Sequence, residues 1–91
     1  MKRLIWTRAA RADLEAIAEY YAGIEPHVGE LLIDRIEQAA AKLARYDTGR
    51  PGRIAGTREK SVAPARYVIV YETHGEMIFI FRVVHMARDW P

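Results

Sequence analysis

The residues best suited to chemistry in this chain are basic, and most of them follow the first half of the sequence. Guanidinium groups attract phosphate and carboxylate by charge and by paired hydrogen bonds, which favours nucleic acid or an acidic protein segment as the ligand. A small protein with a pI near 9.2 has basic residues in its loops even when it binds no ligand. Each single arginine is therefore explained equally well as a surface residue without a binding role. The set comprises Arg45, Arg50, Arg53, Arg58, Lys60, Arg66, Arg82 and Arg88.

Two residues near the end of the chain are the strongest candidates for a site. Arg82 interrupts an apolar run, and a guanidinium inside a sheet needs a carboxylate or an open cleft. Glu59 and Glu72 are the expected internal partners, and this pairing is as well supported as a functional role. His85 follows the same run and could act as a general acid or base, because histidine changes charge near neutral pH. A structural hydrogen bond explains a lone histidine more simply.

Several classes of site lack the residues that they require. There is no cysteine, which excludes disulfides and thiolate metal sites, and the histidines have no metal-ligand spacing. Gly49, Gly52 and Gly56 lack the strand-to-helix setting of a phosphate-binding loop. No metal or cofactor is therefore expected. No apolar stretch approaches the roughly 18 residues of a membrane span, so we expect a cytoplasmic protein without a membrane anchor.

The first 43 residues predict a short strand and then a helical hairpin. The segment Met1–Trp6 ends in the apolar run Leu4–Trp6 and predicts a short strand. It is followed by Thr7, whose hydroxyl can cap a helix that runs to about Ala22 and stops at Gly23. Pro26 suits the first turn of a second helix. The buried stripe of that helix is expected to comprise Val28, Leu32, Ile36, Ala39, Ala40 and Leu43.

Charge is segregated along the chain. Residues 13 to 37 carry seven acidic residues and one basic residue, whereas residues 38 to 91 carry nine basic and five acidic residues. The acidic residues fall mainly on the outer faces of the predicted helices, which is typical of a solvated surface. We therefore expect one acidic and one basic surface.

The second half predicts strands. The turn-rich loop Asp47–Arg53 leads to a weak strand over Gly56–Val62 and two strong strands over Arg66–Glu72 and Met77–Val84. Gly75 suits a tight antiparallel hairpin between the strong strands. The chain is thus expected to form one α+β domain over residues 1–91, with an N-terminal strand, a two-helix hairpin and a three-stranded antiparallel meander (β-α-α-β-β-β).

Both faces of the predicted sheet are apolar. Strict alternation places Ile78 and Ile80 on one face and Met77, Phe79, Phe81 and Val83 on the other. Two helices can cover one face, so the second must be covered by the C-terminal segment with Trp90, by self-association or by another protein. We favour a partner protein, bound by apolar burial and main-chain hydrogen bonds.

Four segments in this order resemble the RelE/ParE toxin family of type II toxin-antitoxin systems. They are residues 6–17, 52–59, 66–71 and 81–91, and they span nearly the whole chain. The β-α-α-β-β-β order agrees with the fold of that family. The resemblance implies an antitoxin encoded beside the toxin, ParD-like for the ParE branch. Its C-terminal segment wraps the toxin in a hetero-oligomer, and its N-terminal part binds operator DNA.

The family has two activities on one scaffold, and the fold alone does not choose between them. ParE-like members poison DNA gyrase, block replication, arrest growth and serve in plasmid stabilisation. RelE-like members cut messenger RNA at the ribosome. The long helical hairpin and residues 56–59 resemble the ParE branch more, which makes a gyrase inhibitor without chemistry of its own the favoured interpretation. A third alternative is an inactive homologue that only binds antitoxin.

The resemblance also assigns candidate site residues. A RelE-like endoribonuclease would use Arg58, Arg82 and His85, which could handle phosphate charge and a proton. In the ParE-like interpretation no catalytic residue is expected. The residues expected to contact the target or the antitoxin are Arg50, Arg53, Arg58, Arg82, Arg88 and Trp90.

Overall fold

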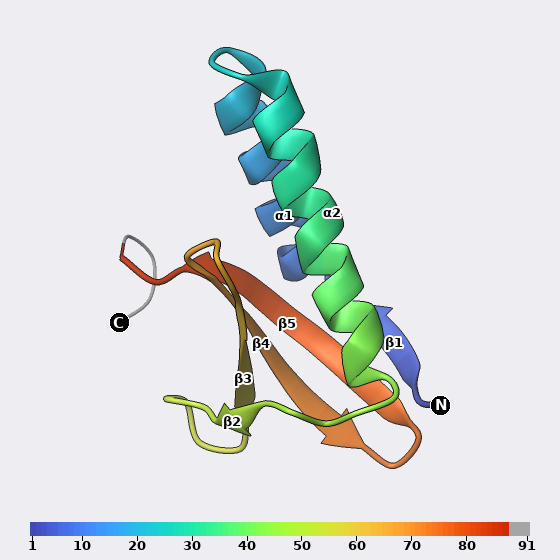
Figure 1. The fold of residues 1–91 in the computed structure, drawn as a ribbon. Coiled ribbons are helices and arrows are strands. Elements are labelled where there is room, and N and C mark those ends of the chain that lie inside the picture. Colours follow the sequence, from blue (N-terminus) through green and yellow to red (C-terminus); the bar gives the residue numbers. More distant parts are fainter. Residues whose placement is uncertain (88–91) are drawn as a thin grey trace.

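In the computed structural model, which describes residues 1–87, a helical hairpin packs against a twisted mixed sheet (Figure 1). The sheet order is β1-β5-β4-β3-β2, with β1 parallel to β5 and the other neighbours antiparallel. The expected α+β fold is confirmed, with a two-residue strand added at one edge. The elements are β1 Arg3–Trp6, α1 Arg8–Ala22, α2 Pro26–Leu43, β2 Arg50–Pro51, β3 Arg58–Val62, β4 Tyr67–His74 and β5 Met77–His85.

Residues at the ends of the two helices of the hairpin set where each helix begins and ends. Thr7 caps α1, because its hydroxyl oxygen accepts a hydrogen bond of 3.1 Å from the amide of Ala10. Gly23 ends α1, and Pro26 opens α2 at a position where its missing amide has no helical partner. A Cβ atom at Gly29 would lie 2.9 Å from Cβ of Tyr21, so the two helices approach closely at this glycine.

The main core lies between the hairpin and the sheet. Ile17 from α1 and Ile36 from α2 are buried in one cluster with Ile69, Tyr71 and Ile78 of the central strands. Burial of each such aliphatic side chain contributes about 1.5–3 kcal/mol. The hairpin is therefore held on the sheet by its apolar stripe rather than by its charged outer faces.

The β4–β5 hairpin turns at Gly75, which has φ of +58°, and His74 pairs with Met77 across the turn. Further along, Val70 pairs with Arg82 but Tyr71 pairs with Ile80, so Phe81 is the extra residue of a β-bulge. The bulge shifts the alternation of β5. Val83 consequently joins the core beneath the helices, which corrects its expected place beside Met77, Phe79 and Phe81.

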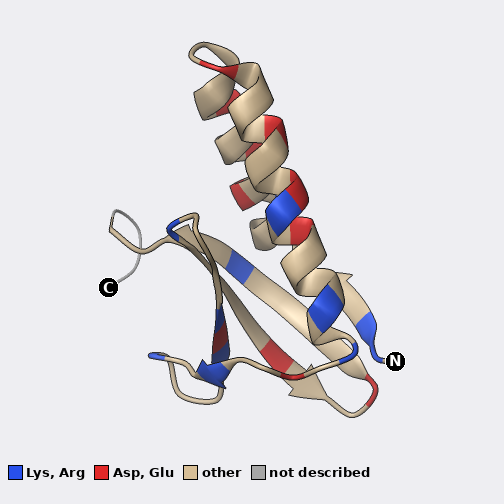
Figure 2. Ribbon diagram, viewed as in Figure 1, with Lys and Arg blue, Asp and Glu red and all other residues tan. Residues whose placement is uncertain are grey.

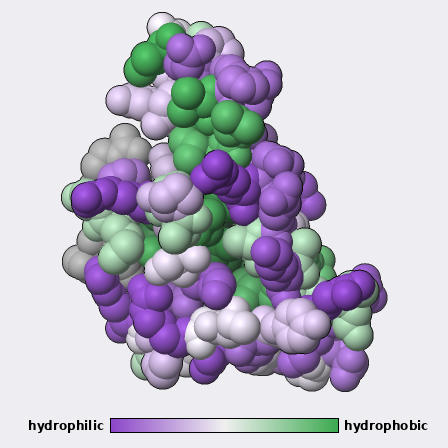
Figure 3. Space-filling view, in the orientation of Figure 1, coloured by the Kyte–Doolittle hydropathy of each residue, from purple (hydrophilic) through white to green (hydrophobic). Residues whose placement is uncertain are grey.

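The second face of the sheet holds a smaller apolar cluster. Val68, Val70 and Val84 form a small cluster there and are almost fully buried. The exposed apolar side chains lie elsewhere, and Figure 3 shows hydrophobic surface over the upper part of the helical hairpin. Within residues 1–87 the large exposed hydrophobic residues are Met1, Tyr20, Ile24, Val28, Leu31, Tyr46, Ile54 and Met86.

Charge follows the layers of the fold (Figure 2). Acidic residues concentrate on the hairpin, and basic residues concentrate around the sheet, the lower end of α2 and the loop after it. Neither helix in the described part of the chain is both long and apolar enough to cross a membrane.

Candidate functional site

Arg82 binds Asp13 of α1, so the expected pairing with Glu59 or Glu72 is wrong. Its Nε and Nη2 atoms donate to the two carboxylate oxygens over 2.8 and 2.9 Å. The amide of Val83 donates to the same carboxylate over 2.8 Å. β1 pairs with β5 only up to Ile80, so this stretch of β5 is an open edge that α1 reaches. The bulge at Phe81 and the approach of α1 together explain why Asp13 is the partner of Arg82. Neither feature can be inferred from the spacing of residues in the sequence.

Arg58 belongs to a network that fastens the loop after α2 to the sheet. Its Nε atom donates to Asp47 over 3.1 Å, and its Nη2 atom donates to the carbonyl oxygen of Gly49. Tyr71 donates its hydroxyl to Asp47 and accepts the Gly49 amide over 3.0 Å. A Cβ atom at Gly49 would lie 2.1 Å from that hydroxyl, so the loop passes directly over the ring.

The same network shifts the titration of its members. The hydrogen bond from Tyr71, followed by the charge of Arg58, lowers the pKa of Asp47. Burial, followed by the hydrogen bond to Asp47, raises the pKa of the Tyr71 hydroxyl. The hydrogen bond with Tyr71 and the charge of Asp47 raise the pKa of Arg58. At neutral pH the network therefore holds a carboxylate, a neutral phenol and a guanidinium.

Glu59 is a buried charged residue of the sheet, with 2% of its surface exposed. It shares the second face with its cross-strand neighbour Val70, and its carboxylate accepts the amide of Arg53 over 2.8 Å. Arg50 of β2 lies 3.5 Å from the other carboxylate oxygen and also donates to the hydroxyl of Ser61 over 3.0 Å. Arg50 and Arg53 thus fold the β2 loop onto this face.

His85 lies at the far end of β5. It pairs with Tyr67 across the strands, and the two rings meet edge to face with centroids 5.2 Å apart. Its Nδ1 atom accepts the amide of Ala87 over 3.2 Å. These contacts match the structural interpretation of a lone histidine.

The three candidate ribonuclease residues do not converge. Arg58 pairs with Tyr71 and His85 pairs with Tyr67, so they sit four residues apart along β4, or about 13 Å. Arg82 pairs with the opposite-facing Val70, and its guanidinium is engaged with α1. The arginines expected to contact the target or the antitoxin do not lie along one face of the sheet either. Arg58 lies on the face of its cross-strand neighbour Tyr71, which is opposite to the face that holds Glu59.

Two expected contact residues, Arg88 and Trp90, lie outside the described residues. Within residues 1–87, no three or more histidine or acidic side chains are grouped so that they could hold a metal ion.

Sequence reasoning missed a groove between α2 and the β3 edge, with a volume of about 500 Å³. Arg35, Ala39 and Lys42 come from one face of α2, and Lys60 and Val62 come from β3. The spacing of Arg35, Ala39 and Lys42 by four and three residues was the available signal, because it places them on one helix face. The rest of the lining is Gln38, Tyr46, Thr48, Ser61 and Ala63.

Comparisons with known proteins place the chain in a family. The model of the ParE toxin of the type II toxin-antitoxin system parDE matches residues 4–90. The chain is 36% identical to protein Y4kP of Sinorhizobium fredii (strain NBRC 101917 / NGR234) over 91 residues, which cover 99% of this chain and 94% of the relative. It is 35% identical to Toxin RelE2 of Caulobacter vibrioides (strain ATCC 19089 / CIP 103742 / CB 15) over 88 residues, which cover 97% and 99%.

Solved structures agree with the fold. The chain is similar to a chain of the chromosomal ParDE toxin-antitoxin system from P. aeruginosa, with a TM-score of 0.85, 27% identity, and coverage of 93% and 96% of the two chains. The toxin-antitoxin complex RelBE2 from Mycobacterium tuberculosis matches with a TM-score of 0.60, 24% identity, and coverage of 92% and 96%, a likeness of fold alone. With the family model matching nearly the whole chain, this protein belongs to the ParE toxin family of type II toxin-antitoxin systems.

Proposed function

We propose that this toxin arrests growth by poisoning DNA gyrase and that an antitoxin encoded beside it neutralises it. The observation that carries the proposal is the dispersal of Arg58, Arg82 and His85. Arg58 is bound to Asp47, Arg82 is bound to Asp13, and the ring of His85 packs on Tyr67. An endoribonuclease must bring phosphate-binding and proton-transferring groups to one scissile bond. A gyrase poison has only to bind a protein-DNA complex, and dispersed groups suffice for that.

The antitoxin partner is supported by the solved relative from P. aeruginosa, which is a ParDE toxin-antitoxin system. The exposed apolar surface on the helical hairpin and the basic surface beside the sheet offer burial and charge to such a partner. A hetero-oligomer of toxin and antitoxin is therefore the proposed resting state.

The second candidate is a RelE-like ribosome-dependent messenger RNA endoribonuclease. The relative named Toxin RelE2, 35% identical over nearly the whole chain, favours this alternative. Under this alternative, Arg58, Arg82 and His85 would have to be drawn together by the ribosome or the RNA, at the cost of the ion pairs that hold both arginines.

Induction of the protein alone in bacteria, with pulse-labelling of DNA and protein synthesis over the first minutes, separates the candidates. Gyrase poisoning predicts an early loss of DNA synthesis with filamentation, while protein synthesis continues. If protein synthesis collapses first, the gyrase proposal is wrong and the ribonuclease takes its place. If neither falls while the antitoxin still binds, the chain is an inactive homologue that serves only as a binding module.

A further inference from the structure

We infer that a cavity between the start of β1 and the end of α2 binds a single DNA strand. Tyr46 stacks on an unpaired base, and Lys2 and Arg45 hold the phosphates. The inference rests on the proposed gyrase poisoning and names the surface that meets the DNA of the gyrase complex. This β1–α2 cavity has a volume of about 460 Å³ and lies at the lower end of the helical hairpin (Figure 1). Its lining is Met1, Lys2, Ala44, Arg45, Tyr46 and Glu76.

Main-chain hydrogen bonds hold the segments around the β1–α2 cavity in place. The amide of Lys2 donates to the carbonyl oxygen of Ala44 over 2.9 Å, which ties the residue before β1 to the end of α2. The amide of Arg3 donates to the carbonyl oxygen of Glu76 over 2.8 Å, which ties β1 to the β4–β5 turn. The cavity is therefore preformed, and a ligand does not have to order these segments when it binds.

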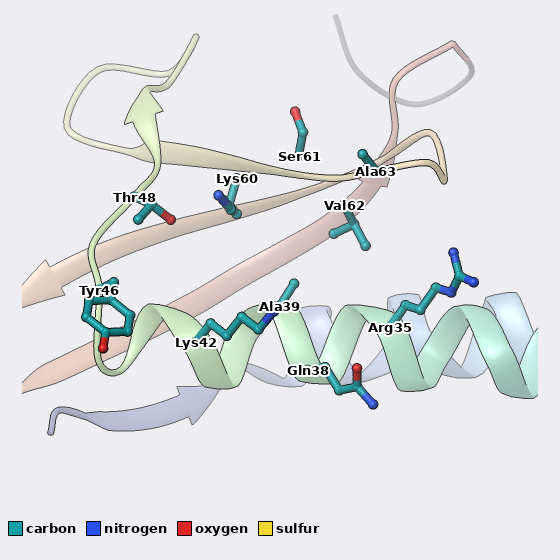
Figure 4. Close-up of a pocket in the computed structure, with 10 residues that line it drawn as sticks. All are labelled: Arg35, Gln38, Ala39, Lys42, Tyr46, Thr48, Lys60, Ser61, Val62 and Ala63. Carbon is teal, nitrogen blue, oxygen red and sulfur yellow. The ribbon is translucent and has the colours of Figure 1, made fainter.

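Tyr46 is an exposed aromatic side chain among cations. The amides of Arg45 and Tyr46 donate to the carbonyl oxygen of Lys42 over 3.0 and 2.9 Å, so a helical turn continues past the end of α2. This spacing places all three residues on one side of the turn, and Figure 4 shows Tyr46 just beyond the turn that carries Lys42. The side chain of Tyr46 is 64% exposed. An exposed ring beside cations suits a nucleic-acid base, because every base has a face that stacks on an aromatic ring.

The charge of the β1–α2 cavity favours phosphate. Figure 2 shows basic residues at the start of the chain and at the end of α2. Within residues 1–87, neither Lys2 nor Arg45 lies in an ion pair with a carboxylate, whereas Arg58 and Arg82 are already paired. Glu76 is the acidic residue among the described lining residues, so positive charge is in excess. Phosphate groups would supply the missing counter-charge.

A single strand fits the cavity better than a duplex or an acidic peptide. The bases of a duplex are paired and stacked on one another, and extruding one costs free energy. A gyrase poison holds the enzyme on cleaved DNA, where a base at a strand end has already lost neighbours and unstacks at least cost. An acidic peptide would satisfy Lys2 and Arg45 but would leave the exposed ring of Tyr46 without a stacking partner.

The test measures binding of the full chain to a fluorescein-labelled oligothymidylate of about ten nucleotides by fluorescence anisotropy. Tyr46→Ala should weaken binding at least about tenfold, and Tyr46→Phe should leave the affinity within about twofold, because stacking needs the ring and not the hydroxyl. Lys2→Gln/Arg45→Gln should weaken binding at least about tenfold and reduce the slope of log affinity against log salt by about 1.4. Loss of one cation alone should weaken binding by only about fourfold.

Two further variants control for damage to the fold. Glu76→Gln should tighten binding at least about twofold, because it removes a carboxylate that repels phosphate. A misfolded variant loses binding but does not gain it. Arg11→Gln removes an exposed cation on α1 outside the cavity and should leave the affinity within about twofold. Circular dichroism of every variant should match the unmutated chain.

The outcomes separate this site from the proposed function, because the same variants are also tested for cleavage of plasmid by gyrase. Lost oligonucleotide binding in Tyr46→Ala, together with a need for at least about tenfold more toxin to cleave plasmid, supports the inference. Unchanged oligonucleotide binding in Tyr46→Ala overturns the site, and gyrase poisoning stands if plasmid is still cleaved. Equal competition by polyglutamate overturns the strand as the ligand. A chain that binds the oligonucleotide through Tyr46 but never traps gyrase keeps the site and overturns gyrase poisoning.

Discussion

The carboxylate of Asp13 holds the guanidinium of Arg82 from 69 residues away and also accepts the main-chain amide of Val83. One side chain of α1 thereby fixes the orientation of a strand arginine and closes the open edge of β5 next to the bulge. An arginine that sequence alone marks as a candidate site residue is thus part of the frame that joins helix to sheet.

Asp13→Ala should lower the free energy of unfolding by about 1–3 kcal/mol, because it leaves the Val83 amide and the Arg82 guanidinium without their acceptor. Urea denaturation measures the change. Glu15→Ala, which removes an exposed carboxylate from the same helix, is the control and should change stability by less than about 0.5 kcal/mol. Equal stability of the two variants would mean that the Asp13 contacts contribute nothing.

Asp47→Asn should make stability less dependent on pH in the acid range. The pKa of Asp47 is lowered in the folded state, so the carboxylate contributes stability above its unfolded pKa of about 3.9. That contribution is lost as pH falls through the lowered folded value. The stability difference between the unmutated chain and Asp47→Asn should therefore shrink as the pH is lowered from 6 through the acid range in urea titrations. A difference that stays constant or grows would contradict the network.

Gly49→Ala should destabilise the chain, because the new methyl group would lie 2.1 Å from the hydroxyl of Tyr71. The loop must lift and release its hydrogen bonds, at a cost of about 1–3 kcal/mol. Gly23→Ala is the matched control, since a methyl group there would have no atom within 4 Å and φ is −92°. That control should be neutral or stabilising by up to about 1 kcal/mol. Thermal unfolding of both variants tests the contrast.

His85→Ala should leave growth arrest unchanged at equal expression, because the ring packs on Tyr67 and accepts the amide of Ala87, which are contacts of a structural residue. A general acid or base would behave differently, since its loss costs about 10²-fold or more in rate. Colony counts after induction measure toxicity, with immunoblots to match expression. Abolished toxicity in a variant that still folds and binds antitoxin would support the ribonuclease.

Replacing Arg58 or Arg82 with alanine should reduce toxicity more than replacing Arg45, an exposed residue beyond the end of α2. We expect the loss of toxicity to come from a less stable fold, because Arg58 forms an ion pair with Asp47 and Arg82 forms one with Asp13. Toxicity and melting temperature should therefore fall together across the three variants. Equal toxicity of all three would show that neither Arg58 nor Arg82 matters for growth arrest.

Local signals in the sequence were sufficient for the helices and the central strands. The Thr7 cap, the Pro26 start and the Gly75 turn each act within a few residues, so their positions follow from residue type. The bulge at Phe81 and the parallel pairing of β1 depend on contacts between distant elements, and the alternation pattern therefore misplaced Val83. The basic groove combines a helix face with a strand edge, so neither segment alone reveals it.

The central claim is that the protein acts on gyrase, and purified components test it most directly. Supercoiled plasmid, DNA gyrase and the toxin would be incubated together, and the DNA would be resolved after denaturing the enzyme. Gyrase poisoning predicts that cleaved linear plasmid accumulates with toxin concentration and disappears when antitoxin is added first. Intact plasmid at every toxin concentration, together with messenger RNA cut on purified ribosomes, would contradict it.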